Sequence, residues 1–316
     1  MTEPSTIPGP APRSPKLGWR GYWAAFRGSV THVGEDKLAL IAAGVAFFAM
    51  LSLFPGLAAL IALLGVVSDP VVVAVQLEDM RPFLPRDVYD IINAQVVSLV
   101  STRNDTLGWA GLLSVLIALW SARAGVGAMI SGLNTVYGER DRNTAKHYFR
   151  ALLLTVALVG VGIIALLSLV VIPIVLAFFP LGLVGTILVD SIRWIVAVVV
   201  LLAGIGMLYR FGPNRRGARI RWLSLGAVVA VVFWVLLSVG FSYYVSNFGN
   251  YNQVYGSIGA VIAMLIWLWI SSFLVLYGAA LNAQIELRTK ADSTIGASRP
   301  PGERAAHAAD TIIEVE

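Results

Sequence analysis

The stretch LALIAAGVAFFAMLSLFPGLAALIALLGVV, residues 38–67, contains no charged side chain. An α-helix rises about 1.5 Å per residue, so about 20 apolar residues suffice to cross the hydrocarbon core of a bilayer, which is about 30 Å thick. A soluble core would break up a run of this length with polar residues. The stretch therefore predicts a membrane-spanning helix, and it decides the fold class of the chain.

Five more runs that are free of charge, or nearly so, follow the first. The composition agrees, because 58% of the 316 residues are hydrophobic and 13% are charged, where a soluble domain carries about a quarter charged residues. Mean hydropathy is +0.79. Ordinary cytosolic enzymes, disordered chains and secreted disulfide scaffolds are excluded, and we predict an all-α polytopic membrane protein with six transmembrane helices. The six runs cover about 38–68, 107–135, 151–179, 191–209, 222–246 and 255–285.

The basic residues lie mainly on one side of this predicted bundle. Of the 23 Lys and Arg residues, 18 fall in the two tails, between runs 2 and 3 or between runs 4 and 5, and three fall between runs 1 and 2. Because Lys and Arg are enriched in cytoplasmic loops, the asymmetry predicts that both termini are cytoplasmic. The net charge of +5 is then a topology signal that also suits anionic headgroups. No RNA-binding motif accompanies it, so we expect membrane lipids and no nucleic acid as partners.

The residues outside the six runs divide into tails and amphipathic segments. Residues 1–17 are rich in proline and are expected to be disordered. Over 18–36, aromatic and aliphatic residues recur every three or four positions beside two arginines, which predicts an amphipathic helix in the inner-leaflet interface. Packing on the cytoplasmic end of the bundle is the alternative, and both can hold. We further expect an outer helical segment, 69–106, within the transmembrane domain 37–288, and a disordered C-terminal tail over 289–316.

The first run contains the pair Pro55-Gly56 a little past its middle. Proline removes a backbone donor and clashes with the preceding turn, so the sequence predicts that the helix kinks or breaks at Pro55 and Gly56. In lipid the freed carbonyl needs another partner, which a neighbouring helix, the Ser52 hydroxyl or water would supply.

Arg123 is the most informative single residue, because it lies inside the second run. An arginine in lipid costs at least about 2.5 kcal/mol on insertion scales, so it should face the bundle interior, water or a phosphate. One interpretation is a contact to an anion or lipid headgroup in a cavity, helped by Ser121. The other is an arginine that snorkels to the cytoplasmic interface. At the end of the sixth run, Asn282 lies with Gln284 and Glu286 either in a solvated helix terminus or in position to hydrogen-bond across helices.

Residues for enzymatic chemistry are scarce. The chain has no cysteine, and its three histidines, His32, His147 and His307, share no metal-binding spacing. Metal-assisted phosphodiester cleavage needs clustered histidine and carboxylate ligands. The sequence also lacks a glycine-rich phosphate loop and a nucleophile elbow. We therefore expect no enzyme activity, no metal and no cofactor.

Three segments carry a resemblance to a known family. They are AFFAMLSLFPGLAALIALLG (46–65), LWSARAGVGAMISGLNTVYGERDR (119–142) and YGSIGAVIAMLIWLWISSFLVLYGAALNAQIE (255–286). In order and content they resemble the YihY/BrkB family of bacterial inner-membrane proteins, and the likeness runs from about residue 30 to 288. The resemblance implies six transmembrane helices and an inner-membrane location. It implies no settled activity, because members have been described as a ribonuclease, as virulence or serum-resistance factors and as candidate envelope-lipid transporters.

One departure from the family pattern concerns ion coupling. Members often carry an acid two positions before the asparagine of the last span, where this chain has Ala280 before Asn282. A role that depends on that acid is not expected here.

These features favour a transporter or permease-like passage for an anionic or amphipathic, lipid-like envelope substrate. They are the broken first span, the arginine at membrane depth and the glycine-rich helix contacts. With no ATP-binding motif, movement would depend on a gradient, a partner or equilibration. The competing hypothesis is a non-transporting scaffold, an envelope-assembly or virulence factor, for which a closed, dry bundle suffices. Membrane lipids, an anionic or lipid substrate and a second copy of the chain are the partners that these hypotheses allow.

Overall fold

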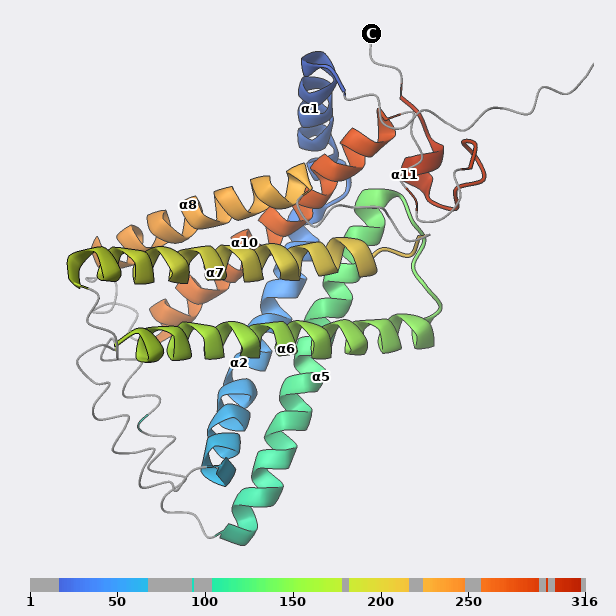
Figure 1. Cartoon of the computed structure of the whole chain (residues 1–316). Helices are drawn as coiled ribbons and strands as arrows, with labels where there is room; N and C mark the ends of the chain where they lie inside the picture. Colours follow the sequence, from blue (N-terminus) through green and yellow to red (C-terminus); the bar gives the residue numbers. More distant parts are fainter. Residues whose placement is uncertain are drawn as a thin grey trace, which may run out of the picture. The chain divides into compact units, whose positions relative to one another are not determined.

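The computed structural model describes residues 17–67, 93, 104–177, 182–215, 224–247, 257–289, 294 and 299–313. The regular elements of this part are helices, in agreement with the predicted all-α class (Figure 1). They are α1 (Trp19–Glu35), α2 (Leu38–Val67), α5 (Asn104–Tyr137), α6 (Thr144–Ala177), α7 (Gly182–Phe211), α8 (Leu225–Asn247), α10 (Ser257–Leu287) and α11 (His307–Asp310).

Each of the six predicted spans coincides with one long helix, namely α2, α5, α6, α7, α8 and α10. Within the described residues, four stretches are long and apolar enough to cross a membrane, and α1 with the first part of α2 forms a pair, bent by 68°, that would make a fifth. In α7 the apolar stretch Ile195–Phe211 is shorter than a full span. The chain is thus an all-helical protein with four to five candidate spans, and six crossings stay a prediction. The four stretches are Leu112–Tyr137, Thr144–Ile164, Leu225–Tyr244 and Val261–Leu287.

The helices belong to two compact units. One comprises Met1–Ala46 with Val126–Glu316, and the other comprises Phe47–Gly125. Helices α2 and α5 each pass from one unit to the other. In the larger unit α10 packs against α8 and α1, and α7 packs against α6 and α8. Small residues dominate the core between α8 and α10, where Ala227, Ala230 and Ala279 are buried, so the helices approach closely.

The closest approach joins Gly226 at the start of α8 to Gly278 on α10. A Cβ added to either glycine would overlap the backbone carbonyl oxygen of the other. Tyr209 of α7 lies at the same place and donates from its hydroxyl to the carbonyl oxygen of Val275, at 2.6 Å. The ends of α7, α8 and α10 are therefore held together by backbone contact and by a buried hydrogen bond.

Helix α1 places its small residues against α10. Gly21, Ala25 and Ser29 are buried on one face, while Trp23 and Phe26 are exposed on the other. Helix α1 therefore packs on the helix bundle, which was the alternative prediction for this segment. The exposed aromatic face leaves the interfacial placement as a compatible prediction, because an aromatic face of this kind suits the headgroup region.

At Pro55 the structure lacks the break that was one of the two predicted outcomes, and the kink stays a prediction. Helix α2 runs without interruption from Leu38 to Val67 with Pro55 inside it. The Ser52 hydroxyl donates to the carbonyl oxygen of Ala49 at 2.8 Å, whereas the carbonyl that proline leaves without a donor is four residues before it, on Leu51. Ser52 is thus bonded within its own turn and does not compensate for the proline.

The C-terminal segment also differs from the disordered tail expected over 289–316. Residues 299–313 fold back, with the Ile313 N–H donating to the carbonyl oxygen of Leu287 at 2.8 Å. Arg304 is 1% exposed, and the Asp310 carboxylate accepts hydrogen bonds from the backbone N–H groups of Gly302 and Arg304. This order comes from polar contacts, which the hydropathy of a tail does not signal. The predicted N-terminal tail and most of the outer segment 69–106 lie outside the described residues.

Candidate functional site

Arg123 lies close to the middle of the candidate span Leu112–Tyr137 and is half-buried. With a rise of about 1.5 Å per residue, the two ends of that span are roughly 17 and 21 Å away along the helix. An arginine snorkels to the interface from positions near a helix end, so the bounds of the helix favour the other interpretation. A charge at this depth is expected to face the bundle interior, water or an anion.

The roles predicted for Ser121 and Ser52 beside Arg123 stay predictions. Ser121 is 1% exposed, and its hydroxyl has no hydrogen-bond partner among the described residues. Ser52 is bonded within α2. The expected help from these two hydroxyls is therefore not tested by the described contacts.

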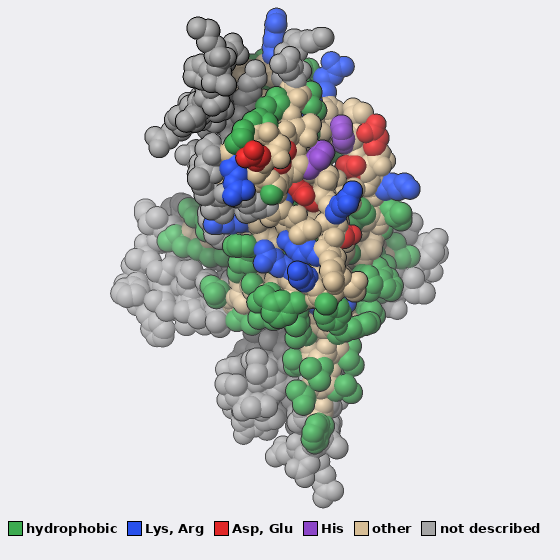
Figure 2. Space-filling model, turned by 90° about the vertical axis from the view of Figure 1, so that its right-hand side faces the viewer, with side chains coloured by type: hydrophobic (Ala, Val, Ile, Leu, Met, Phe, Trp, Pro, Cys, Tyr) green, Lys and Arg blue, Asp and Glu red, His purple; other side chains and the backbone are tan. Residues whose placement is uncertain are grey.

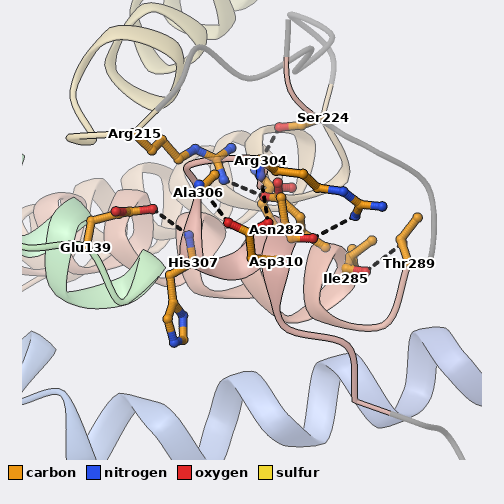
Figure 3. Close-up of polar contacts among 12 residues, drawn as sticks. Glu139, Arg215, Ser224, Asn282, Ile285, Thr289, Arg304, Ala306, His307 and Asp310 are labelled. Atoms are coloured by element: carbon orange, nitrogen blue, oxygen red, sulfur yellow. Dashed lines mark hydrogen bonds and ion pairs between the residues drawn. The ribbon is translucent and has the colours of Figure 1, made fainter. Parts of the chain in front are cut away.

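Asn282 makes the cross-helix hydrogen bonds that were one of its two predicted roles (Figure 3). Its carbonyl oxygen accepts from the Gly226 N–H at 2.9 Å, and its amide donates to the Ser224 hydroxyl, also at 2.9 Å. The Ser224 hydroxyl in turn accepts from the Ala227 N–H at 3.2 Å. Asn282 and Ser224 together satisfy donors in the first turn of α8, which that helix cannot satisfy itself. The residue therefore holds α8 to α10, and it belongs to a different unit from Arg123.

A buried ion pair lies beside this contact. The Nη1 atom of Arg215, after α7, lies 2.8 Å from the Oε2 atom of Glu286 on α10. The two side chains are 3% and 10% exposed. The guanidinium carbon of Arg215 also lies 4.3 Å from the centre of the Tyr137 ring. Burial by itself lowers the pKa of Arg215, but the Glu286 carboxylate, together with Tyr137 and Glu139, outweighs burial and raises the pKa. The guanidinium is therefore charged, and Glu286 compensates its charge.

The sequence gives no sign of this pair, because its members are 71 residues apart and one of them lies in a loop. From the sequence, Arg215 counts only as one of the basic residues that indicate topology. The one hint of the pair is that Glu286 is a charged residue at the end of an apolar run.

Further polar contacts tie the loops at this end together. Asn134 donates from its amide to the Asp141 carboxylate at 2.6 Å and accepts from the Asn214 N–H at 2.7 Å. Glu139 accepts from the His307 N–H at 2.8 Å, and burial raises the pKa of Glu139, an effect that this hydrogen bond partly offsets. These groups satisfy one another, so they build the end of the bundle. Among the described residues no group of three His, Asp or Glu side chains could hold a metal ion.

Comparisons with known proteins agree with the predicted family. A family model described as virulence factor BrkB matches residues 29–303. The ribonuclease-like protein YfkH of Bacillus subtilis is 32% identical over 277 residues, which cover 82% of this chain and 92% of that protein. A UPF0761 membrane protein of Pseudoalteromonas atlantica is 24% identical over 82% of this chain and 84% of its own length.

A shorter match, to a UPF0761 membrane protein of Tolumonas auensis, is 34% identical over 86 residues, or 28% of that protein. No solved structure matches the chain. The family match spans most of the sequence and includes every long helix of the structure. The chain is an integral membrane protein that belongs to the virulence factor BrkB family.

Proposed function

We propose that the protein is a six-helix inner-membrane protein, with both termini cytoplasmic, that binds an anionic, amphipathic envelope lipid or lipid-like substrate and gives it passage. The observation that carries the proposal is the half-buried Arg123 near the middle of a candidate span. A guanidinium there costs at least about 2.5 kcal/mol on insertion scales. A planar, always charged fork that forms two parallel hydrogen bonds suits a phosphate or a carboxylate.

The orientation is supported by the contacts at one end of the larger unit. In the loop after α7, the Asn214 side-chain amide donates to the carbonyl oxygen of Arg140 in the loop after α5, at 2.8 Å. The loop after α7 is bonded to the end of α10 through Arg215 and Glu286, and α1 also packs on α10. The segments with most of the Lys and Arg residues therefore gather at one end, which is expected if the number of crossings is even. The positive-inside rule would place that end in the cytoplasm.

Cysteine labelling tests this topology. The chain contains no cysteine, so single cysteines at Asn93, Asn250 and the exposed loop residue Arg140 can each be treated with an impermeant maleimide in intact cells. We expect Asn93→Cys and Asn250→Cys to react and Arg140→Cys to react only after the membrane is permeabilised. Labelling of Arg140→Cys alone in intact cells would reverse the orientation.

Substitution of Arg123 tests the substrate site. We expect Arg123→Lys to insert and fold normally but to lose most lipid passage, because the charge is kept while the two-point geometry is lost. The measurement is reduction by dithionite of fluorescent phosphatidylglycerol in the inner leaflet of proteoliposomes, since the reagent reaches only the outer leaflet unless the protein lets the lipid cross. Arg140→Lys, an exposed arginine in a loop, is the matched control.

The outcomes separate passage from scaffolding. If Arg123→Lys lets labelled phosphatidylglycerol cross as fast as the wild-type protein does, Arg123 is not the residue that contacts the substrate. If the wild-type protein moves neither labelled phosphatidylglycerol nor labelled organic anions, passage fails and the scaffold hypothesis gains.

A further inference from the structure

Three arginines converge on the C-terminal end of α7, apart from Arg123. Arg142 donates from its two terminal nitrogens to the carbonyl oxygens of Gly212 and Pro213, at 2.8 and 2.7 Å. Arg150 donates from Nε to the carbonyl oxygen of Phe211, at 2.8 Å. Arg210 and Arg150 place their guanidinium carbons 5.4 and 5.8 Å from the centre of the Phe211 ring. All three side chains are half-buried.

Cations at a helix C-terminus are favourable by themselves, because the last carbonyl groups carry partial negative charge. Arg142 and Arg150 fulfil that role here with three hydrogen bonds. Arg210 does not, since it makes no hydrogen bond to any described residue and its Nε is buried. Capping of α7 therefore accounts for two of the arginines but leaves the third unexplained.

The cluster has an excess of positive charge and of hydrogen-bond donors. None of the three arginines forms an ion pair within the described part of the chain, and the nearby Asp141 carboxylate accepts from Asn134. Burial, together with the charge of Arg150, lowers the pKa of Arg142. The terminal nitrogens of Arg150 and of Arg210 remain available as donors, whereas the Arg210 Nε is buried. Charges of one sign held this close favour binding of an anion.

The position of the cluster along the helices indicates which anion. Arg150 is the last charged residue of α6 before the uncharged run from Ala151 to Ala177. Arg210 is the first charged residue after the uncharged run that begins at Trp194 in α7. The hydrogen bond from Arg150 to Phe211 brings both to one level, where apolar helix surface ends. The polar headgroups of a bilayer lie at that level.

The cluster is open to the surroundings on its helices. The Phe211 side chain is 38% exposed, and Lys146, one turn before Arg150 on α6, is exposed. Figure 2 shows Lys and Arg side chains gathered on the face where, in Figure 1, α6 begins and α7 ends. An anion can thus reach the free donors of Arg150 and Arg210 from outside the bundle.

We propose that Arg150 and Arg210, beside the Phe211 ring, form a binding site for the phosphate of an anionic phospholipid in the leaflet at the basic end of the bundle. The lipid there is a bound component of the protein and not the passing substrate. The inference therefore goes beyond the proposed function and does not depend on Arg123.

Titration of lipids onto the purified protein in neutral detergent, followed by native mass spectrometry, tests the site. We expect the wild-type protein to bind phosphatidylglycerol at least about tenfold more tightly than phosphatidylcholine, and Arg210→Gln to lose that preference, because charge-assisted hydrogen bonds to phosphate are the strong ones. Arg210 makes no hydrogen bond that the fold requires, so the variant should keep its thermal stability without lipid. Arg140→Gln removes the same charge from a nearby exposed position and should bind like the wild type.

Other outcomes overturn the assignment. One is equal binding of the two lipids by the wild-type protein. Another is phosphatidylglycerol binding by Arg210→Gln that is as tight as in the wild-type protein. Inorganic phosphate provides the second arm. If it raises the melting temperature of the wild-type protein as much as phosphatidylglycerol does, and competes with it, the ligand is a soluble phosphate and the lipid is excluded.

Discussion

Replacing Gly226 by alanine is expected to lower the free energy of unfolding by about 3 kcal/mol or more, although it adds a single methyl group. The added Cβ would overlap the carbonyl oxygen of Gly278 and would lie 2.7 Å from the amide carbon of Asn282. The Gly278 oxygen belongs to the backbone and the Asn282 amide is held by two hydrogen bonds, so α8 has to move away from α10. That movement also breaks the hydrogen bond from the Gly226 N–H to Asn282.

Gly240 on the same helix provides the matched control. A Cβ at Gly240 meets nothing within 4 Å, so Gly240→Ala should leave stability unchanged or raise it by up to about 1 kcal/mol through helix propensity. Thermal unfolding in detergent, monitored by the monodisperse fraction on size exclusion, measures both variants. Equal melting temperatures for Gly226→Ala and Gly240→Ala would contradict the backbone contact between α8 and α10.

The positions of the long helices could be predicted from the sequence because each depends on the local run of apolar residues alone. The run at 38–68 became α2, Leu38–Val67, and the run at 255–285 became α10, Ser257–Leu287. The interruption expected inside α2 could not be judged in the same way. A proline removes one hydrogen bond, and its neighbours in the helix keep theirs, so the helix continues through Pro55.

Contacts between distant segments were beyond the reach of the sequence. Asn282 could be recognised as a residue that might bond across helices, because an amide near the end of an apolar helix has few local partners. Its partners on α8 could not be named, since hydropathy does not show which helices are neighbours. The same holds for Arg150 and Arg210, which lie between predicted spans and therefore count in the sequence as topology charges. Their convergence on Phe211 cannot be seen from that pattern.

The bounds of α5 favour ligand binding by Arg123 over snorkelling, which the sequence alone could not decide. The apolar run at 107–135 leaves the boundaries of the second span open by several residues, and snorkelling and ligand binding are then equally good explanations. The helix continues to Tyr137, which moves its C-terminal end farther from Arg123. Each additional residue adds about 1.5 Å to the distance that a snorkelling side chain has to bridge.

Breaking the buried pair of Arg215 and Glu286 is expected to cost about 3–5 kcal/mol of stability, the largest effect of any single charge removal in the described part of the chain. Arg215→Met would leave the Glu286 carboxylate buried without its partner at 2.8 Å, and it would remove the cation from the Tyr137 ring. Glu286→Leu would leave the guanidinium uncompensated in the same place. The cost arises mainly from the charge that remains, because its desolvation is no longer offset.

The double variant Arg215→Met/Glu286→Leu distinguishes this explanation from simple loss of packing. With both charges replaced by apolar groups, no buried charge is left uncompensated, and stability should return to within about 1–2 kcal/mol of the wild type. The cycle is measured as the melting temperature of the four proteins in detergent, with Arg140→Met as the control for loss of an exposed arginine. If the two single variants are as stable as Arg140→Met, or if the double variant loses the sum of both single losses, the pair does not compensate buried charge. The end of the bundle would then be held by other contacts, such as those of Asn134 and Asn282.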